Sequence, residues 1–349
     1  MRKTGMVLLL MVCSAGQAAS FDCTKAKTPQ EKAICASPEL SKAEEEMAAA
    51  YWAVLKSAPA EMVEAVREGQ RQWLRSVAIT CPARSWAKPG QLEDCLKDDY
   101  LGRTDVLQGS IAWKNGIQFV WRSVTLTAPD DDDAAKEDRE RGELSDHGTL
   151  NASWPQANSK SPEWQAWNVA MENAARKMAT NRPQPGGEWR QEWAVDQDID
   201  ITVAIRFVSK DLVTATLTNM FFGHGAAHPN TDSIQFNWLL KEQRELQREE
   251  VFRKGSNWDQ MLQKRCDQYL HKALDTDGES YESFYPGQMT KILHEIVIDP
   301  KNWQIDSSGI TIVFQPYAVA CYACTPSPVT ISWKDLKPFL QPSFEIPKE

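Results

Sequence analysis

Cysteine and histidine are the residues of this sequence whose types and spacing could do chemistry. Cys321 and Cys324 have the Cys-x-x-Cys spacing of redox pairs, which use a helix N-terminus to stabilise a thiolate. Here the pair follows a strand pattern and precedes the Thr-Pro-Ser-Pro segment 325–328, which cannot begin a regular helix. We therefore predict a structural disulfide, with Cys266 as a candidate partner and one of the three cysteines left over.

Two histidines, His224 and His228, have the spacing of metal ligands on a helix. Glycines on both sides of His224 disfavour a helix, and no glutamate stands between the histidines to act as a general base. The pattern favours a glycine-permitted turn between two strands, where the histidines pack or contact a partner. We predict no metal site and no cofactor.

Four more cysteines, Cys23, Cys35, Cys81 and Cys95, lie in the first quarter of the chain. Nothing nearby indicates the low-pKa setting of an active thiol, so we predict two structural disulfides. Three connectivities are open. Each bridge would contribute on the order of 2–4 kcal/mol, a large share of the stability of so small a region.

Other catalytic motifs are not visible in the sequence. It contains no Gly-x-Ser-x-Gly, no phosphate-binding loop and no recognisable carboxylate pair. We therefore predict a protein without catalysis. Because glycosidase carboxylates have no local signature, an enzyme acting on peptidoglycan is kept as an alternative.

The first twenty residues resemble a secretory signal. A basic start precedes an apolar run over 6–12 and small residues up to Ser20, so cleavage could follow Ala18 or Ser20. Val12, the residue before Cys13, disfavours lipid attachment at that cysteine. No later segment has the roughly 20 apolar residues of a membrane-spanning helix, so we expect a periplasmic protein without a membrane span.

The elements that position these residues divide into a helical part and a strand-rich part. Proline after Thr28 and Ser37 marks two helix starts, and apolar faces run over 40–55, 62–77 and 92–107, which predicts an antiparallel helical bundle. Later segments alternate apolar and polar residues, and two helices interrupt them. Strands in runs with few helices predict an antiparallel α+β domain. The strands are centred on 198–207, 234–240 and 310–314, and the helices are expected at 163–180 and 258–274.

We predict four regions from these patterns. They are a signal peptide (1–20), a helical domain (21–108), a strand-rich module (109–220) and an α+β domain (221–345). The run 130–146 is acidic and nearly free of apolar residues, so it is expected to be a solvated loop. The net charge of −9 argues against a nucleic acid partner and suits a basic protein.

The helical segment resembles the LprI-type lysozyme-inhibitor domain, which implies binding to lysozyme. It departs from the family pattern at Glu44 and at Val77 with Ala78. The residues that carry the resemblance are Phe21 to Cys23, Thr28, Pro29, Glu31, Ile34, Cys35, Pro38 to Leu40, Tyr51, Gln70, Trp73, Leu74, Cys81, Cys95, Leu96, Tyr100, Arg103 and Leu107.

The C-terminal part resembles the RsiV-type domain of lysozyme-sensing proteins, which also occurs beside peptidoglycan deacetylase domains. The resemblance is carried by the segments 223–229, 309–314, 316–323 and 329–331 and by Phe236, Trp238, Leu246, Val251 and Phe252. Within it, His224, His228, Tyr317 and Tyr322 are the candidate partner-binding residues.

The two resemblances together predict a periplasmic protein that binds lysozyme or a similar basic muramidase. Inhibition and sensing are both compatible with this pattern. Peptidoglycan is the alternative partner, and an accessory factor of cell-wall modification is the alternative function.

Overall fold

The computed structural model describes residues 19–81, 91–129, 147–179, 196–275 and 280–348. The expected signal peptide, up to residue 18, and the acidic run 130–146 lie outside these ranges. The chain forms two compact units, one made of residues 1–56 and 80–108 and the other of 57–79 and 109–349. Within the described ranges, no helix is long and apolar enough to cross a membrane.

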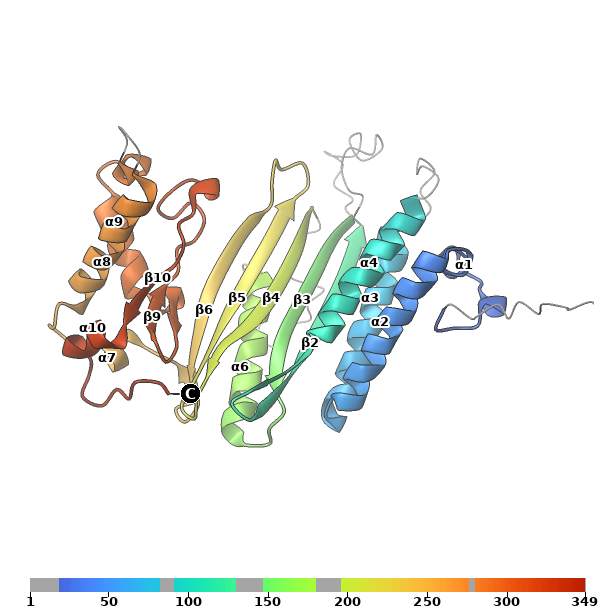
Figure 1. The fold of residues 1–349 in the computed structure, drawn as a ribbon, viewed down its shortest axis with the longest axis horizontal. Coiled ribbons are helices and arrows are strands. Elements are labelled where there is room, and N and C mark those ends of the chain that lie inside the picture. Colours follow the sequence, from blue (N-terminus) through green and yellow to red (C-terminus); the bar gives the residue numbers. More distant parts are fainter. Residues whose placement is uncertain (1–18, 82–90, 130–146, 180–195, 276–279, 349) are drawn as a thin grey trace, which may run out of the picture. The chain divides into compact units, whose positions relative to one another are not determined.

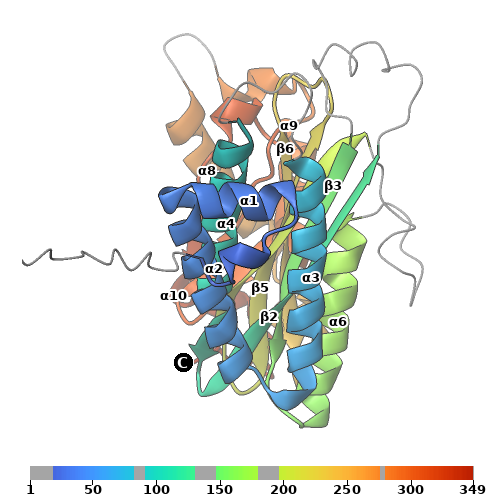
Figure 2. The same cartoon turned by 90° about the vertical axis from the view of Figure 1, so that its right-hand side faces the viewer.

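The first unit is helical. Thr28 caps the start of α1, as expected from the Thr-Pro pattern, and it forms a reciprocal capping box with Glu31. Figure 2 shows α1 crossing α2 at a steep angle. The interior contains Leu40, Met47 and Leu96. The elements are η1 (Cys23–Lys25), α1 (Pro29–Ala36), α2 (Pro38–Ser57) and α4 (Gln91–Gln108).

One helix of the expected bundle, α3 (Val63–Thr80), belongs by its contacts to the second unit up to Ile79. It follows the short turn η2 (Ala60–Met62). The side chains of Ser76 and Thr127 are hydrogen bonded at 2.6 Å. A side chain at Gly69 would place its Cβ 2.9 Å from the Ser123 carbonyl oxygen, so only glycine allows this close approach of helix and strand.

A seven-stranded sheet forms the centre of the second unit (Figure 1). Its strands follow one another in chain order, and all neighbours are antiparallel except β3 and β4. Those two are parallel because α6 (Pro162–Ala179) connects them. The strands are β1 (Ile111–Lys114), β2 (Ile117–Pro129), β3 (His147–Ala157), β4 (Gln197–Val208), β5 (Leu212–Gly223), β6 (Asn230–Leu239) and β7 (Arg244–Glu245).

Opposite faces of β2 contact different helices. Arg122 forms an ion pair at 2.9 Å with Glu172 of α6, whereas the next residue, Ser123, faces α3. Alternation along the strand therefore places α6 and α3 on the two sides of the sheet. Trp154 and Trp167 are fully buried on the α6 side.

A C-terminal α+β part completes the second unit. Its three-stranded sheet has the order β10, β9, β8. The helix α8 (Trp258–Leu274) has the expected bounds, but α9 (Met289–Ile298) was not expected, since its run of Ile and Val is also typical of a strand. The other elements are α7 (Arg248–Val251), η5 (Tyr281–Phe284), η6 (Pro300–Asn302), β8 (Trp303–Ile305), β9 (Gly309–Ile312), η7 (Tyr322–Cys324), β10 (Val329–Ser332), α10 (Trp333–Leu336) and η8 (Lys337–Phe339).

Polar side chains connect this C-terminal part to the large sheet. Asn237 Nδ2 donates to the Trp303 carbonyl at 2.7 Å, and its Oδ1 accepts from the Thr214 hydroxyl at 3.0 Å. Both side chains are buried. The expected boundary near residue 220 falls within β5, so one continuous sheet spans it. The predicted class, a disulfide-stapled helical part followed by an α+β part, is confirmed.

Candidate functional site

The described cysteines form three disulfides, between Cys23 and Cys35, Cys81 and Cys95, and Cys321 and Cys324. Cys266 had been the candidate partner for the last group, and this was wrong. It lies in α8 within the hydrophobic core, with no exposed surface and no disulfide. Burial raises the pKa of its thiol to about 12, which keeps it protonated and unreactive.

Several residues that carry the LprI resemblance lie in the interior. Tyr100 and Arg103 are both buried. Burial lowers the pKa of Arg103 to about 10, although the nearby Tyr51 opposes the shift. Burial also raises the pKa of Tyr100 to about 12. These positions therefore support the fold of the helical unit, and a partner would have to contact other residues.

An exposed acidic row on α4 offers such a contact surface. Asp94, Asp98, Leu101 and Asp105 are all exposed and repeat at helical spacing along one face. We call this set the α4 stripe. Lys97 lies nearby but forms an ion pair with Glu39. The stripe was not predicted from the sequence, although the helical spacing of its three aspartates was a usable signal.

The two histidines flank a turn between β5 and β6, as the glycines predicted. Gly225 has a positive φ of 83° within this turn. The His224 side chain is only 5% exposed and lies 3.8 Å from the Asp198 carboxylate. His228, by contrast, is exposed. The histidines thus have different surroundings, and His224 does not join the residues described next.

Three of the four candidate partner-binding residues come together in space. The rings of His228 and Tyr322 lie 4.8 Å apart, and those of Tyr317 and Tyr322 lie 5.6 Å apart. Tyr317 Oη and His228 Nε2 are 3.3 Å apart. We call these three residues the His–Tyr cluster. Its members are separated by as many as 94 positions in the chain, so the fold alone assembles it.

Hydrogen bonds and a disulfide hold the His–Tyr cluster in place. Tyr285 donates a hydrogen bond to the Tyr317 carbonyl, and Tyr317 itself has a left-handed φ of 62°. The Cys321–Cys324 disulfide closes a ring that contains Tyr322. Gln315 Oε1 accepts from the Ser233 amide at 2.7 Å, which attaches this loop to β6. Tyr317 is 47% exposed, so its ordered phenol lies at the protein surface.

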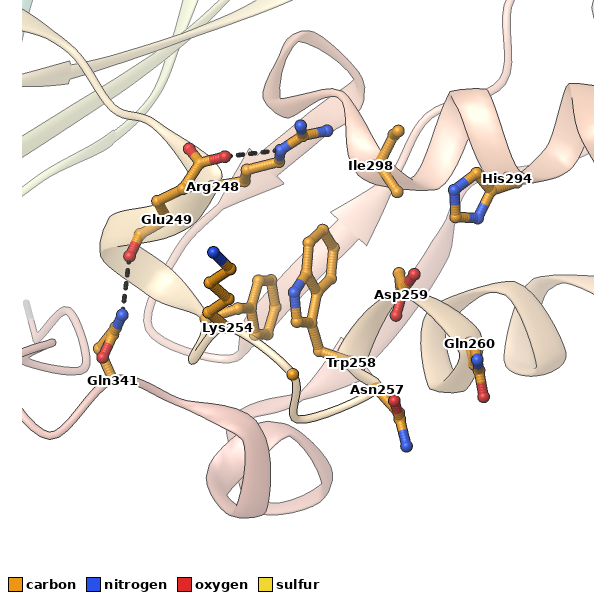
Figure 3. Close-up of a pocket in the computed structure, with 12 residues that line it drawn as sticks. Arg248, Glu249, Lys254, Asn257, Trp258, Asp259, Gln260, His294, Ile298 and Gln341 are labelled. Atoms are coloured by element: carbon orange, nitrogen blue, oxygen red, sulfur yellow. Dashed lines mark hydrogen bonds and ion pairs between the residues drawn. The ribbon is translucent and has the colours of Figure 1, made fainter.

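A pocket of about 580 Å³ lies elsewhere in the C-terminal part (Figure 3). Its wall comes from α7, from the turn before α8, from the first turn of α8 and from α9. This pocket was not predicted from the sequence, because its residues are distant in the chain and match no motif. They include Arg248, Glu249, Phe252, Lys254, Asn257, Trp258, Asp259, Gln260, His294, Ile298 and Gln341.

Comparison with known families identifies two domains. Residues 23–107 match the family described as lysozyme inhibitor LprI, and residues 249–334 match a protein family of unknown function, DUF3298. The chain therefore carries an LprI lysozyme-inhibitor domain followed by a DUF3298 domain, in the order that the resemblances predicted. Neither matched family is described as the RsiV type, so that assignment stays a prediction.

Two solved structures of DUF3298 proteins are similar to this chain. The one from Bacteroides fragilis is 17% identical, with a TM-score of 0.45 over 64% of this chain and 94% of its own. The one from Pseudomonas aeruginosa is 14% identical, with the same TM-score and the same coverage. No curated protein matches the chain.

Proposed function

We propose that this protein binds lysozyme or a similar basic muramidase in the periplasm and has no catalytic activity of its own. The observation that carries the proposal is the match of residues 23–107 to a family described as lysozyme inhibitors. Three disulfides support an oxidising compartment, as does the signal-like N-terminus.

The surface charge of α4 suits a basic partner. The helix carries five carboxylates and two cations. Of those cations, Arg103 is buried and Lys97 is paired with Glu39, so the carboxylates dominate the exposed face. Such a face attracts a cationic protein and raises the association rate more than the affinity. Leu101, which is 39% exposed, adds an apolar contact within the α4 stripe.

The His–Tyr cluster is the second surface that we assign to partner binding. Tyrosine is enriched at the energetic centres of interfaces because it buries a large ring and also offers a hydroxyl. Tyr317 and Tyr322 are positioned by a disulfide ring and by Tyr285, so ordering them on binding would cost little entropy. We infer that this surface determines which muramidase is recognised, whereas the α4 stripe accelerates the encounter.

Surface-based binding kinetics with hen-type and goose-type lysozymes test the proposal. The expected result is binding that weakens as salt rises, because salt screens the charges of the α4 stripe. Changing Asp94, Asp98 and Asp105 together to Asn should lower the association rate about tenfold and leave the dissociation rate nearly unchanged. Tyr317→Ala should instead raise the dissociation rate.

The matched control for the triple variant changes Glu242, Glu295 and Glu345 to Gln. These exposed residues lie in the second unit, and the change in net charge is the same. If both triple variants slow association equally, total charge and not the α4 stripe determines the encounter. No binding to either lysozyme at low ionic strength would overturn the proposal, and retention on purified sacculi would then favour the peptidoglycan alternative. Lysis assays with the same proteins distinguish inhibition from binding alone.

A further inference from the structure

The pocket beside Trp258 has a well-defined frame. Left-handed backbone at Gly255 (φ 75°) and Asn257 (φ 57°) turns the chain so that α8 begins with Trp258. The C-terminal segment fixes the opposite wall. The side-chain Nε2 of Gln341 donates to the Glu249 carbonyl at 3.0 Å, and the backbone N–H of Gln341 donates to the Val251 carbonyl at 2.8 Å. The pocket is therefore built by contacts that span the whole C-terminal part, and it is not a gap left by one loop.

An aromatic stack holds the Trp258 ring. Phe252 lies parallel to it, with ring centroids 4.4 Å apart and an angle of 5° between the planes. Trp303 meets it edge-on at 5.8 Å. Phe252 and Trp303 are buried, whereas Trp258 is half-buried and lines the pocket. Because Phe252 covers one face of the indole, a ligand can stack only on the other, and the ring is already ordered to receive it.

Polar side chains surround this ring without partners of their own. Within the ranges that the structure describes, the side chains of Lys254, Asn257, Asp259, Gln260 and His294 make no hydrogen bond or ion pair with the protein. Figure 3 shows Ile298 and His294 on one side of Trp258, and Arg248, Glu249 and Lys254 on the other. The pocket thus offers hydrogen-bond donors and acceptors of several kinds around a flat apolar surface.

The charges of the lining residues balance. Arg248 and Lys254 are cationic, Glu249 and Asp259 are anionic, and Arg248 forms an ion pair with Glu249 at 2.9 Å. A balanced site gives no net attraction to phosphates or other polyanions, which need clustered cations. A ligand rich in hydroxyl groups satisfies both donors and acceptors without adding charge.

We propose that the Trp258 pocket binds a neutral glycan. One pyranose ring stacks on the face of Trp258 that Phe252 does not cover, and its hydroxyl groups hydrogen bond to Asp259, Gln260 and His294. The volume of about 580 Å³ is within the usual range of small-ligand sites, about 300–1,000 Å³. This site goes beyond muramidase recognition and does not depend on it, since the glycan binds with no second protein present.

Titration calorimetry and tryptophan fluorescence of the full mature chain test this site, with three probes. Tri-N-acetylchitotriose and cellotriose are neutral glycans with and without acetamido groups, and trigalacturonate is a charged control. We expect at least one neutral trisaccharide to bind and trigalacturonate to bind more weakly. Trp258→Ala should weaken binding at least about tenfold through loss of the stacking surface. The paired change of Asp259 and Gln260 to Ala should also weaken it without touching the aromatic stack.

Trp113→Ala is the matched control, because Trp113 is 66% exposed on β1 and distant in the chain from the pocket. It should bind the glycan as the unchanged protein does. Thermal unfolding identifies any variant that has lost its fold, and the Asp259/Gln260 variant then decides the result. The proposal is overturned if neither neutral trisaccharide binds, if binding survives both pocket variants, or if trigalacturonate binds most tightly. Lysozyme affinity should be unchanged in Trp258→Ala, so failure here is distinguishable from failure of the proposed function.

Discussion

The two units of this protein are stabilised in different ways. Among the largest fully buried side chains of the described residues, only Leu40 and Leu96 lie in the helical first unit, and all the aromatic ones, including Trp154, Trp167 and Trp303, lie in the second. The first unit instead has two of the three disulfides found among the described residues. A small helical unit with little aromatic core thus depends on covalent links, whereas a large sheet is stabilised by packing.

The same difference extends to the candidate binding surfaces. The α4 stripe lies on one regular helix, so its geometry survives wherever that helix is intact. The His–Tyr cluster and the Trp258 pocket are assembled from several segments that are distant in the sequence. Sites of this second kind need the surrounding core to remain in place. The four predictions that follow test this contrast.

The largest effect should come from the aromatic core of the second unit. Trp167→Ala removes a fully buried ring that meets Phe119 and Trp164 edge-on at 5.5 and 5.7 Å. The free energy of unfolding should fall by about 3–5 kcal/mol, measured by chemical denaturation. The exposed Trp113→Ala should change it by less than about 0.5 kcal/mol. Equal losses would mean that aromatic burial does not stabilise this unit.

Removing one of the two disulfides of the first unit, Cys81–Cys95, should have the next largest effect. Changing Cys81 and Cys95 to Ala opens a loop with a sequence separation of 14, which should cost about 3 kcal/mol. The same change at Cys321 and Cys324, with a separation of 3, should cost only about 2 kcal/mol. Limited proteolysis should show earlier cleavage within residues 19–108 for the first variant only. A larger loss at Cys321 and Cys324 would contradict the contrast between the units.

Local periodicity predicted much of this fold. Strict alternation over 198–207 indicated β4, and the apolar spacing of 258–274 indicated α8 with the observed bounds. It did not predict α9, where Ile and Val suit a strand as well as a helix. It also did not predict that α3 would contact the sheet, since that depends on the absence of a side chain at Gly69.

The candidate sites were less predictable than the elements. Four spaced positions on α4 could be read from the sequence, because helical neighbours recur every three or four residues. The meeting of His228 with Tyr317 could not, since tertiary contacts between distant loops produce it. The sequence also could not show that Cys321 pairs with Cys324 and not with Cys266, because this too depends on tertiary structure. Cys266 faces inward from α8, a direction that spacing alone does not give.

A smaller effect is expected at Cys266, which tests how tightly the core of the second unit excludes polar groups. Cys266→Ser places a hydroxyl where no surface is exposed, and should cost about 1–3 kcal/mol. Cys266→Ala should cost less, because it leaves a small cavity but no buried polar group. Thermal unfolding of the two variants measures the difference. If Ser is tolerated as well as Ala, a polar partner or water reaches this position and the core is less closely packed than described.

The smallest effect is a pH dependence at the end of α8. The Asp275 carboxylate, which lies 2.8 Å from His271 Nδ1, raises the pKa of His271 by hydrogen bonding. The pKa of Asp275 is lowered, first by the Tyr281 amide and then by His271. A raised histidine pKa stabilises the fold fully below the unfolded value of about 6.5, and this contribution is lost as pH rises through the folded pKa.

The Asp275 contribution has the opposite sign, since a lowered carboxylate pKa stabilises the fold above its unfolded value and is lost as pH falls. The pair is therefore most stabilising in mildly acidic solution. Because the His271 side chain is 41% exposed, solvent screening should keep the effect small. Melting temperatures between about pH 5 and pH 9 should fall less steeply toward high pH in His271→Gln than in the unchanged protein. His294→Gln changes a histidine without an ion pair among the described residues, so it should leave the slope of melting temperature against pH unchanged. If both variants change this slope equally, His271 is not the residue that causes it.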